Sequence, residues 1–189
     1  GVIMAGKTEI ANRTLIKLGK PRVSNIETET SHAAITVNNL WSTVRDSLLQ
    51  SYLWNFEIKR VALAPEGTNP DNGWDRHFLP PVDFLQLLDE KDEIEYLVEG
   101  GRILANGVTE LYARYIARSE DTSLYPALFN EMLIITLAIE GCDRITQDKN
   151  LKTTLLAEQK MIAQRALGAD AIENTPEDPP LDDWLRDRL

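Results

Sequence analysis

The chain of 189 residues contains few of the residues that build disulfides and metal sites. It has one cysteine, Cys142, and two histidines, His32 and His77. A single cysteine excludes an internal disulfide, and three such residues far apart in the sequence disfavour a Cys- or His-based metal site. We therefore expect no cofactor and no metal, and we interpret Cys142 as a small core residue.

Basic residues are also scarce: 20 Lys and Arg stand against 30 Asp and Glu, which gives a net charge of −10 and a pI near 4.7. Proteins that grip nucleic acid by neutralising phosphates usually carry a basic excess or a basic stripe. The acidic balance fits a surface that keeps the protein dissolved, or one past which DNA moves without sticking. No apolar run approaches the roughly 20 residues that span a bilayer, so no membrane contact is expected.

Motifs of common enzymes are missing. The sequence has no glycine-rich phosphate loop, no Gly-x-Ser-x-Gly and no His-Glu-x-x-His. A glycosidase needs two separated carboxylates, one with a raised pKa. Glu140 follows an apolar stretch that could raise its pKa, although we interpret it as the point where a helix reaches solvent. The paired acids lie in polar, loop-like sequence: Glu27 with Glu29, Asp89 with Glu90, and Glu120 with Asp121. We therefore expect no catalytic residue.

Apolar residues at spacings of three and four predict four helices, at about 8–18, 31–52, 126–142 and 150–167. The first is expected to start with Thr8 as its N-cap and to end at Gly19. The third is apolar on nearly every side, which predicts a central, buried position. Gly168 is expected to end the fourth.

Between the second and third helices lies a predicted β insertion, at about 57–118. Residues 58–63 alternate as a strand does, whereas 82–88 fit either a strand or a helical turn. The pairs Gly100–Gly101 and Asn106–Gly107 are hairpin signals between runs at 94–99, 102–105 and 110–118. They predict a three-stranded antiparallel meander. We expect cross-strand ion pairs between its arginines (Arg102, Arg114, Arg118) and its glutamates (Glu95, Glu99, Glu110).

The predicted fold class is therefore α+β: a four-helix bundle with an inserted antiparallel β-hairpin or meander region and an extended C-terminal arm. Residues 1–172 form the expected single domain. The arm, 173–189, holds three prolines and a charge of 2 − 6 = −4, which is typical of a segment that does not fold alone.

Candidate partner contacts come from three places. The arm carries apolar anchors suited to docking on a partner, although a frayed tail is an equally good interpretation: Leu181, Trp184, Leu185 and Leu189. The long loop 65–74 offers Asn69, Asp71, Asn72 and Trp74. The predicted hairpin tip offers Gly100 and Gly101.

Several short motifs occur in an order that resembles one family. They are Leu18-Gly19-Lys20-Pro21-x-Val23-Ser24, Trp54-Asn55-Phe56, Pro81-Val82-Asp83, Val98-Glu99-Gly100-Gly101 and Tyr115-Ile116 leading to Asp121. Together they resemble the head-to-tail adaptor proteins of short-tailed bacteriophages, of the tail tubular protein A type. The resemblance spans most of residues 8–140 and does not include the C-terminal arm.

The resemblance implies a non-enzymatic ring protein of the virion tail, made in the host bacterial cytoplasm. Relatives form a ring, expected to be twelvefold, between the portal and the tail nozzle, and DNA crosses its lumen. The implied partners are other copies of the chain, the portal protein, the nozzle protein and tail fibres. Two other functions stay open: a virion-associated peptidoglycan hydrolase, and an unrelated soluble interaction module.

Overall fold

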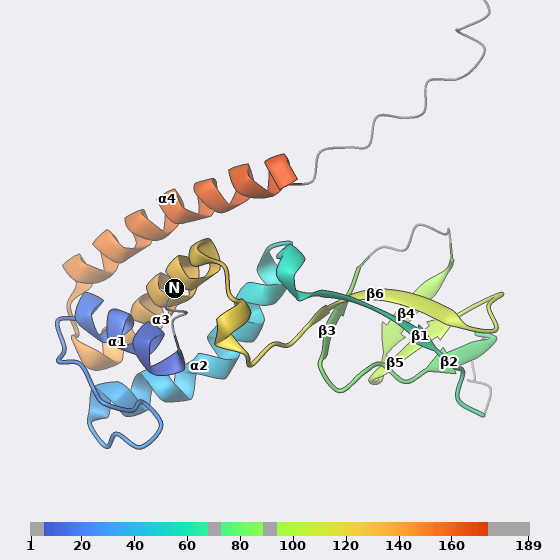
Figure 1. Ribbon diagram of the computed structural model, residues 1–189, viewed down its shortest axis with the longest axis horizontal. Coiled ribbons are helices and arrows are strands. Elements are labelled where there is room, and N and C mark those ends of the chain that lie inside the picture. Colours follow the sequence, from blue (N-terminus) through green and yellow to red (C-terminus); the bar gives the residue numbers. More distant parts are fainter. Residues whose placement is uncertain (1–5, 68–72, 89–93, 174–189) are drawn as a thin grey trace, which may run out of the picture.

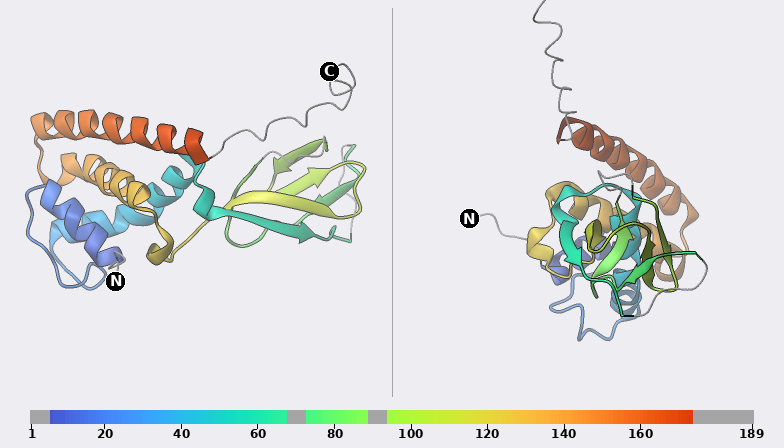
Figure 2. Two further views of the ribbon diagram at one scale, coloured as in Figure 1. Left: turned by 45° about the horizontal axis from the view of Figure 1, so that its top comes forward. Right: turned by 90° about the vertical axis from the view of Figure 1, so that its right-hand side faces the viewer.

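The computed structural model describes residues 6–67, 73–88 and 94–173. Figure 1 shows two parts placed end to end along the long axis of the molecule. We call the helical part, α1–α4, the helical body, and the part that contains β1–β6 the β region. The chain leaves the helical body after α2 and returns to it before α3, so the β region is inserted between these helices (Figures 1 and 2). The fold is mixed helix and sheet, as the α+β prediction requires.

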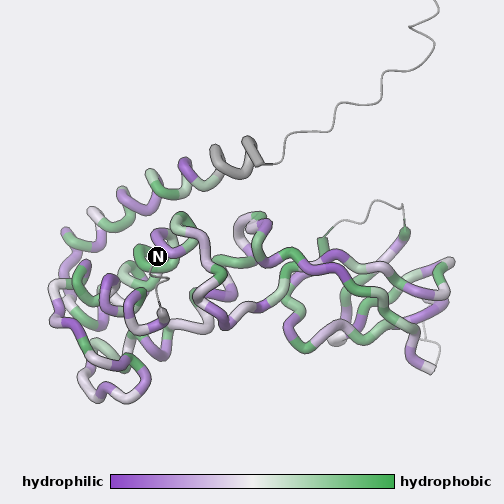
Figure 3. The backbone as a smooth tube through the Cα atoms, viewed as in Figure 1, coloured by the Kyte–Doolittle hydropathy of each residue, from purple (hydrophilic) through white to green (hydrophobic). Residues whose placement is uncertain are grey.

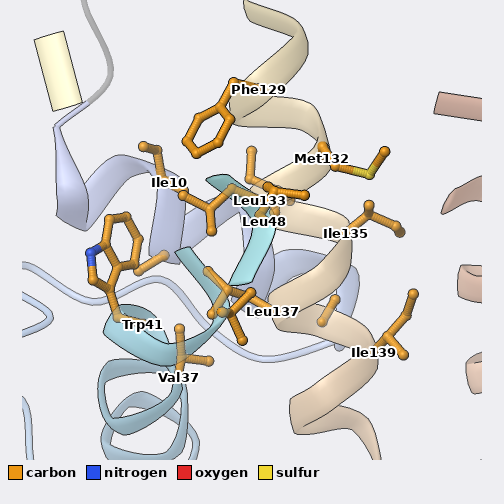
Figure 4. Close-up of a cluster of buried hydrophobic side chains, with 14 of the residues drawn as sticks. Ile10, Val37, Trp41, Leu48, Phe129, Met132, Leu133, Ile135, Leu137 and Ile139 are labelled. Carbon is orange, nitrogen blue, oxygen red and sulfur yellow. The ribbon is translucent and has the colours of Figure 1, made fainter. Parts of the chain in front are cut away.

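The helical body contains α1 (Lys7–Lys17), α2 (His32–Ser51), α3 (Ala127–Ile145) and α4 (Lys149–Glu173). α3 packs against each of the other three, because apolar side chains cover nearly its whole circumference. Figure 3 shows α3 as largely hydrophobic. Figure 4 shows three side chains of α3, Phe129, Leu133 and Leu137, near residues of α1 and α2: Ile10, Val37 and Trp41. The predicted central position of this helix is confirmed.

Helix ends follow the sequence signals in part. α1 closes with Gly19 at φ +66°, where Gly19 N donates to Ile16 O at 2.9 Å and Lys20 N to Leu15 O at 2.8 Å. These two bonds form a Schellman motif, as the glycine indicates. Thr8 does not cap the helix: Gly6 is the N-cap, and the Thr8 hydroxyl instead accepts from Ile26 N at 3.3 Å.

The predicted end of the second helix, residue 52, lies one residue beyond Ser51, whereas the predicted ends of the third and fourth helices are too early. α3 continues beyond 142 to Ile145, and α4 passes through Gly168 to Glu173, the residue at which the arm was expected to begin. A glycine inside a helix costs only about 1 kcal/mol relative to alanine, so it weakens a helix without ending it.

The described strands lie between residues 58 and 117, within the predicted insertion. They are β1 (Ile58–Leu63), β2 (Arg76–Phe78), β3 (Phe84–Leu87), β4 (Tyr96–Glu99), β5 (Arg102–Ala105) and β6 (Leu111–Ala117). They form two antiparallel sheets, in the orders β1-β6-β3 and β2-β5-β4. The ambiguous segment 82–88 therefore contains a strand, and His77 lies on β2.

The predicted meander is wrong in its last pairing. β4 and β5 form the expected hairpin, but β6 pairs with β1 and β3, and β2 pairs with the other edge of β5. Gly107, at φ +73°, leads the chain from one sheet to the other. Both sheets contribute buried side chains to one cluster, including Phe78 and Ile103 from one and Leu111 and Ala113 from the other. A single meander would leave these apolar residues exposed on one face.

Candidate interaction surfaces and the junction

Four aromatic rings form the centre of the junction between the helical body and the β region. Phe129 of α3 is fully buried and meets Trp54, Phe56 and Tyr125 edge-on, with ring centroids 5.0, 5.1 and 4.8 Å away. Phe56 lies on the 3₁₀ turn η1 (Asn55–Glu57) that leads into β1, and Tyr125 follows the turn η2 (Thr122–Leu124) after β6. The cluster therefore contacts both segments by which the chain leaves and re-enters the helical body.

A polar network lies beside these rings. Arg45 of α2 is buried and reaches Asp46 Oδ1 at 2.8 Å, while Arg118, just after β6, donates from Nε to Asp46 Oδ2 at 2.7 Å. Glu120 lies 3.8 Å from Arg45. Asp46 thus joins an arginine of the helical body to one of the β region, and charge-assisted bonds of this kind fix geometry well.

Two buried acids complete the junction. Glu57 is 2 % exposed, and its Oε1 has no hydrogen-bond partner. Burial raises the pKa of the Glu57 carboxyl, because the charged form loses its hydration. Burial also raises the pKa of Tyr125 to about 12, and its hydroxyl donates to Ser119 O at 2.8 Å. Sequence reasoning missed this junction, since its members are separated by up to about 80 positions. The one local signal was the aromatic run Trp54-Asn55-Phe56.

A second polar cluster stiffens the β region near the junction. Asp83 accepts from Lys59 Nζ at 2.7 Å and from the Tyr115 hydroxyl at 3.1 Å. The hydrogen bond from Lys59 lowers the pKa of Asp83. These residues tie β1 and β6 to the turn before β3.

The predicted contact residues are only partly described. Gly100 and Gly101 form the exposed β4–β5 turn, at φ +57° and +73°, as the hairpin signal indicates. Trp74 lies half-buried just before β2. The other loop candidates, Asn69, Asp71 and Asn72, and the arm candidates, Leu181, Trp184, Leu185 and Leu189, lie outside the described residues.

Exposed apolar side chains occur on both parts. The edge strand β4 exposes Leu97 and Val98, at 42 % and 44 %. On α4, Leu156 and Met161 are 44 % and 68 % exposed. An open groove of about 530 Å³ runs between α2, α3 and α4, with apolar lining from Leu40, Val44, Leu48 and Met132. Edge strands and helix faces of this kind are the usual contact surfaces of assembling proteins.

The residues weighed for catalysis are dispersed. Glu140 is exposed at the rim of this groove, in agreement with the interpretation that α3 reaches solvent there. His32 is exposed, Cys142 is fully buried as expected, and His77 Nε2 lies 3.1 Å from Glu66 Oε2. Within the described ranges, no three His, Cys, Asp or Glu residues are grouped as metal ligands would be.

The expected cross-strand ion pairs are wrong. Arg102 pairs with Glu66, which precedes β2, and Arg118 pairs with Asp46 of α2. Arg114 has no ion-pair partner among the described residues, and its Nε is buried without a hydrogen bond. Arg102 meets Glu66 because β2 lies along the other edge of β5, whereas the surroundings of Arg114 and Arg118 differ because β6 pairs with β1 and β3.

None of the described helices is both long and apolar enough to cross a membrane. A scan against protein-family models and a search of curated proteins both found no match to this chain.

Proposed function

We propose that this chain is a structural head-to-tail adaptor of a short-tailed bacteriophage, a subunit of a ring between portal and tail nozzle through which DNA passes. The observation that carries the proposal is the junction, which joins two elongated parts through a packed aromatic cluster and an ion-paired network. A connector must hold its partners at fixed relative positions. A well-packed junction keeps the helical body and the β region of each subunit in one arrangement, as this role requires.

The distribution of exposed apolar residues supports several simultaneous contacts. Leu97 and Val98 lie on the β region, whereas Leu156 and Met161 lie on the helical body. A closed ring needs two different surfaces on each subunit, because the front of one copy meets the back of the next. Within the proposal, the helical body is a four-helix bundle that stacks side by side, and the β region projects towards an unlike ring.

The charge balance also supports passage rather than capture of DNA. With 20 basic and 30 acidic residues, the chain carries a net charge of −10. A lumen with this sign repels phosphates and keeps DNA mobile. The virion location and the contacts with portal, nozzle and further copies belong to this same proposal.

The test is a mass measurement of the full chain alone and mixed with the portal ring of its own phage, together with electron micrographs. The expected result is an annular complex on the portal. The double variant Leu97→Lys/Val98→Lys is expected to weaken ring formation or docking, whereas Leu124→Lys, at a more exposed turn residue, leaves both unchanged. Absence of any annular particle with the unaltered chain would overturn the proposal.

A further inference from the structure

The outer face of the β1–β6 pair holds two arginines directly opposite each other. Arg60 and Arg114 are register partners on neighbouring strands. Their neighbours Val61 and Ala113 contribute to the apolar cluster between the sheets, so the two arginines lie on the other face. Directly opposed side chains on antiparallel strands have Cβ atoms about 5 Å apart, and like charges at this distance are destabilising.

No carboxylate of the described ranges, 6–67, 73–88 and 94–173, forms an ion pair with either arginine. Arg60 is exposed and Arg114 half-buried. Arg114 Nε is buried without an acceptor, although its backbone oxygen accepts from Leu88 N at 2.8 Å. Glu110, at the start of β6, accepts from the Tyr112 hydroxyl instead. An anion that draws the two guanidinium groups outward gains charge-assisted bonds and removes the repulsion.

Apolar surface borders the pair. Tyr112 and Ala62 are register partners on the same outer face, one step further along the strands, and Tyr112 is 68 % exposed. The face therefore combines two cations with an exposed aromatic ring. Its complement is a peptide that alternates carboxylates with apolar anchors, rather than a bare anion.

The chain contains such a peptide. Residues 174–189 hold five carboxylates and two arginines, a charge of 2 − 5 = −3, and among the carboxylates Asp182 and Asp183 directly precede Trp184 and Leu185. α4, which precedes this segment, ends at Glu173 on the side of the helical body that faces the β region (Figure 2). Nine extended residues lead from Glu173 to Asp182 and reach about 30 Å, which is more than the roughly 23 Å length of a seven-residue strand such as β6.

From these observations we propose that Arg60 and Arg114 form a carboxylate-binding site for the acidic C-terminal arm of the same chain, residues 174–189. Asp182 accepts from the two arginines, and Trp184, two residues further on the same face of an extended arm, packs on Tyr112 and Ala62. The proposal does not depend on the adaptor function, since it concerns a contact within one subunit. Tethering favours it, because a linked segment has a high effective concentration at its own site.

Trypsin tests the proposal in the full chain, since Arg186 and Arg188 lie in the arm. We expect Arg60→Gln/Arg114→Gln to speed removal of the last residues by about three- to tenfold, as measured by mass spectrometry. Asp182→Asn/Asp183→Asn gives the same acceleration, and the quadruple variant adds nothing further. Arg13→Gln, at an exposed arginine of α1, is the matched control and leaves the rate unchanged.

Two further readouts separate this contact from other causes. In NMR spectra of the full chain, Asp182→Asn/Asp183→Asn should shift the amides of Ala62 and Tyr112 and leave those of α1 in place. The thermal midpoint of the arginine variant should change little, because the substitution removes both the attraction to the arm and the repulsion between the two arginines. If Arg114→Gln does impair folding, Arg60→Gln alone carries the test. Additive or absent effects on cleavage would overturn the proposal, and so would binding of a DNA duplex that depends on both arginines while the arm stays equally cleavable.

Discussion

Phe129 is the residue on which the junction most depends, and Phe129→Ala is the sharpest test of its packing. The side chain is fully buried and meets three aromatic rings at centroid distances of 4.8 to 5.1 Å. Replacing a buried phenylalanine by alanine costs about 3–5 kcal/mol, and each edge-on aromatic pair adds roughly 0.5–1.5 kcal/mol beyond its buried area. We therefore expect a loss near the top of this range, about 4–5 kcal/mol.

Urea unfolding followed by Trp fluorescence measures the loss, and calorimetry should show a midpoint lowered by about 8–20 °C for a chain of this size. Phe129→Leu keeps most of the volume but no ring, so it should cost about 1–2 kcal/mol. Leu124→Ala, at a 56 % exposed residue of η2, is the control and should change stability by less than about 0.5 kcal/mol. A loss below about 2 kcal/mol for Phe129→Ala would refute the packing described here.

Three further predictions follow from the junction and from one helix end. Arg45→Met removes the buried arginine and should lower the free energy of unfolding by about 2–4 kcal/mol. Arg118→Gln, at the more exposed arginine that binds the same Asp46, should lower it by less than about 1 kcal/mol. Equal losses in urea unfolding would contradict the network. Because the folded state holds Glu57 with a raised pKa, stability of the unaltered chain falls as pH rises from the ordinary pKa of Glu towards the raised one. Glu57→Gln should remove this fall and be more stable by about 1–2 kcal/mol at pH 7 but not at pH 4, and a difference independent of pH would argue against a buried carboxylate. Gly19→Ala, at φ +66°, should destabilise by about 1 kcal/mol. Gly67→Ala, at an exposed glycine without positive φ and with open space around the new Cβ, should be nearly neutral, and thermal melts of the two variants compare these losses.

Local patterns in the sequence determined the helices and several of the turns. The apolar spacing of α1, α2 and α3 located them within a few residues, because one helix face must be buried wherever the helix packs. Gly19 and Gly100–Gly101 marked real turns, since positive φ is a local requirement that glycine meets at little cost. The excess of acidic over basic residues and the presence of a single cysteine, Cys142, were also evident from the sequence alone.

Only the tertiary structure decided which strands pair and which charges meet. The residues of β6 do not by themselves indicate whether its neighbour is β5 or β1. β6 pairs with β1 and β3 because this arrangement buries the apolar faces of the two sheets against each other. The ion pair of Arg118 with Asp46 follows from that choice, and so does the position of Arg114, whose Nε is buried without a hydrogen-bond partner among the described residues. A turn or a helix end is fixed by a few adjacent residues, whereas an ion pair or a sheet register depends on residues brought together from distant parts of the chain.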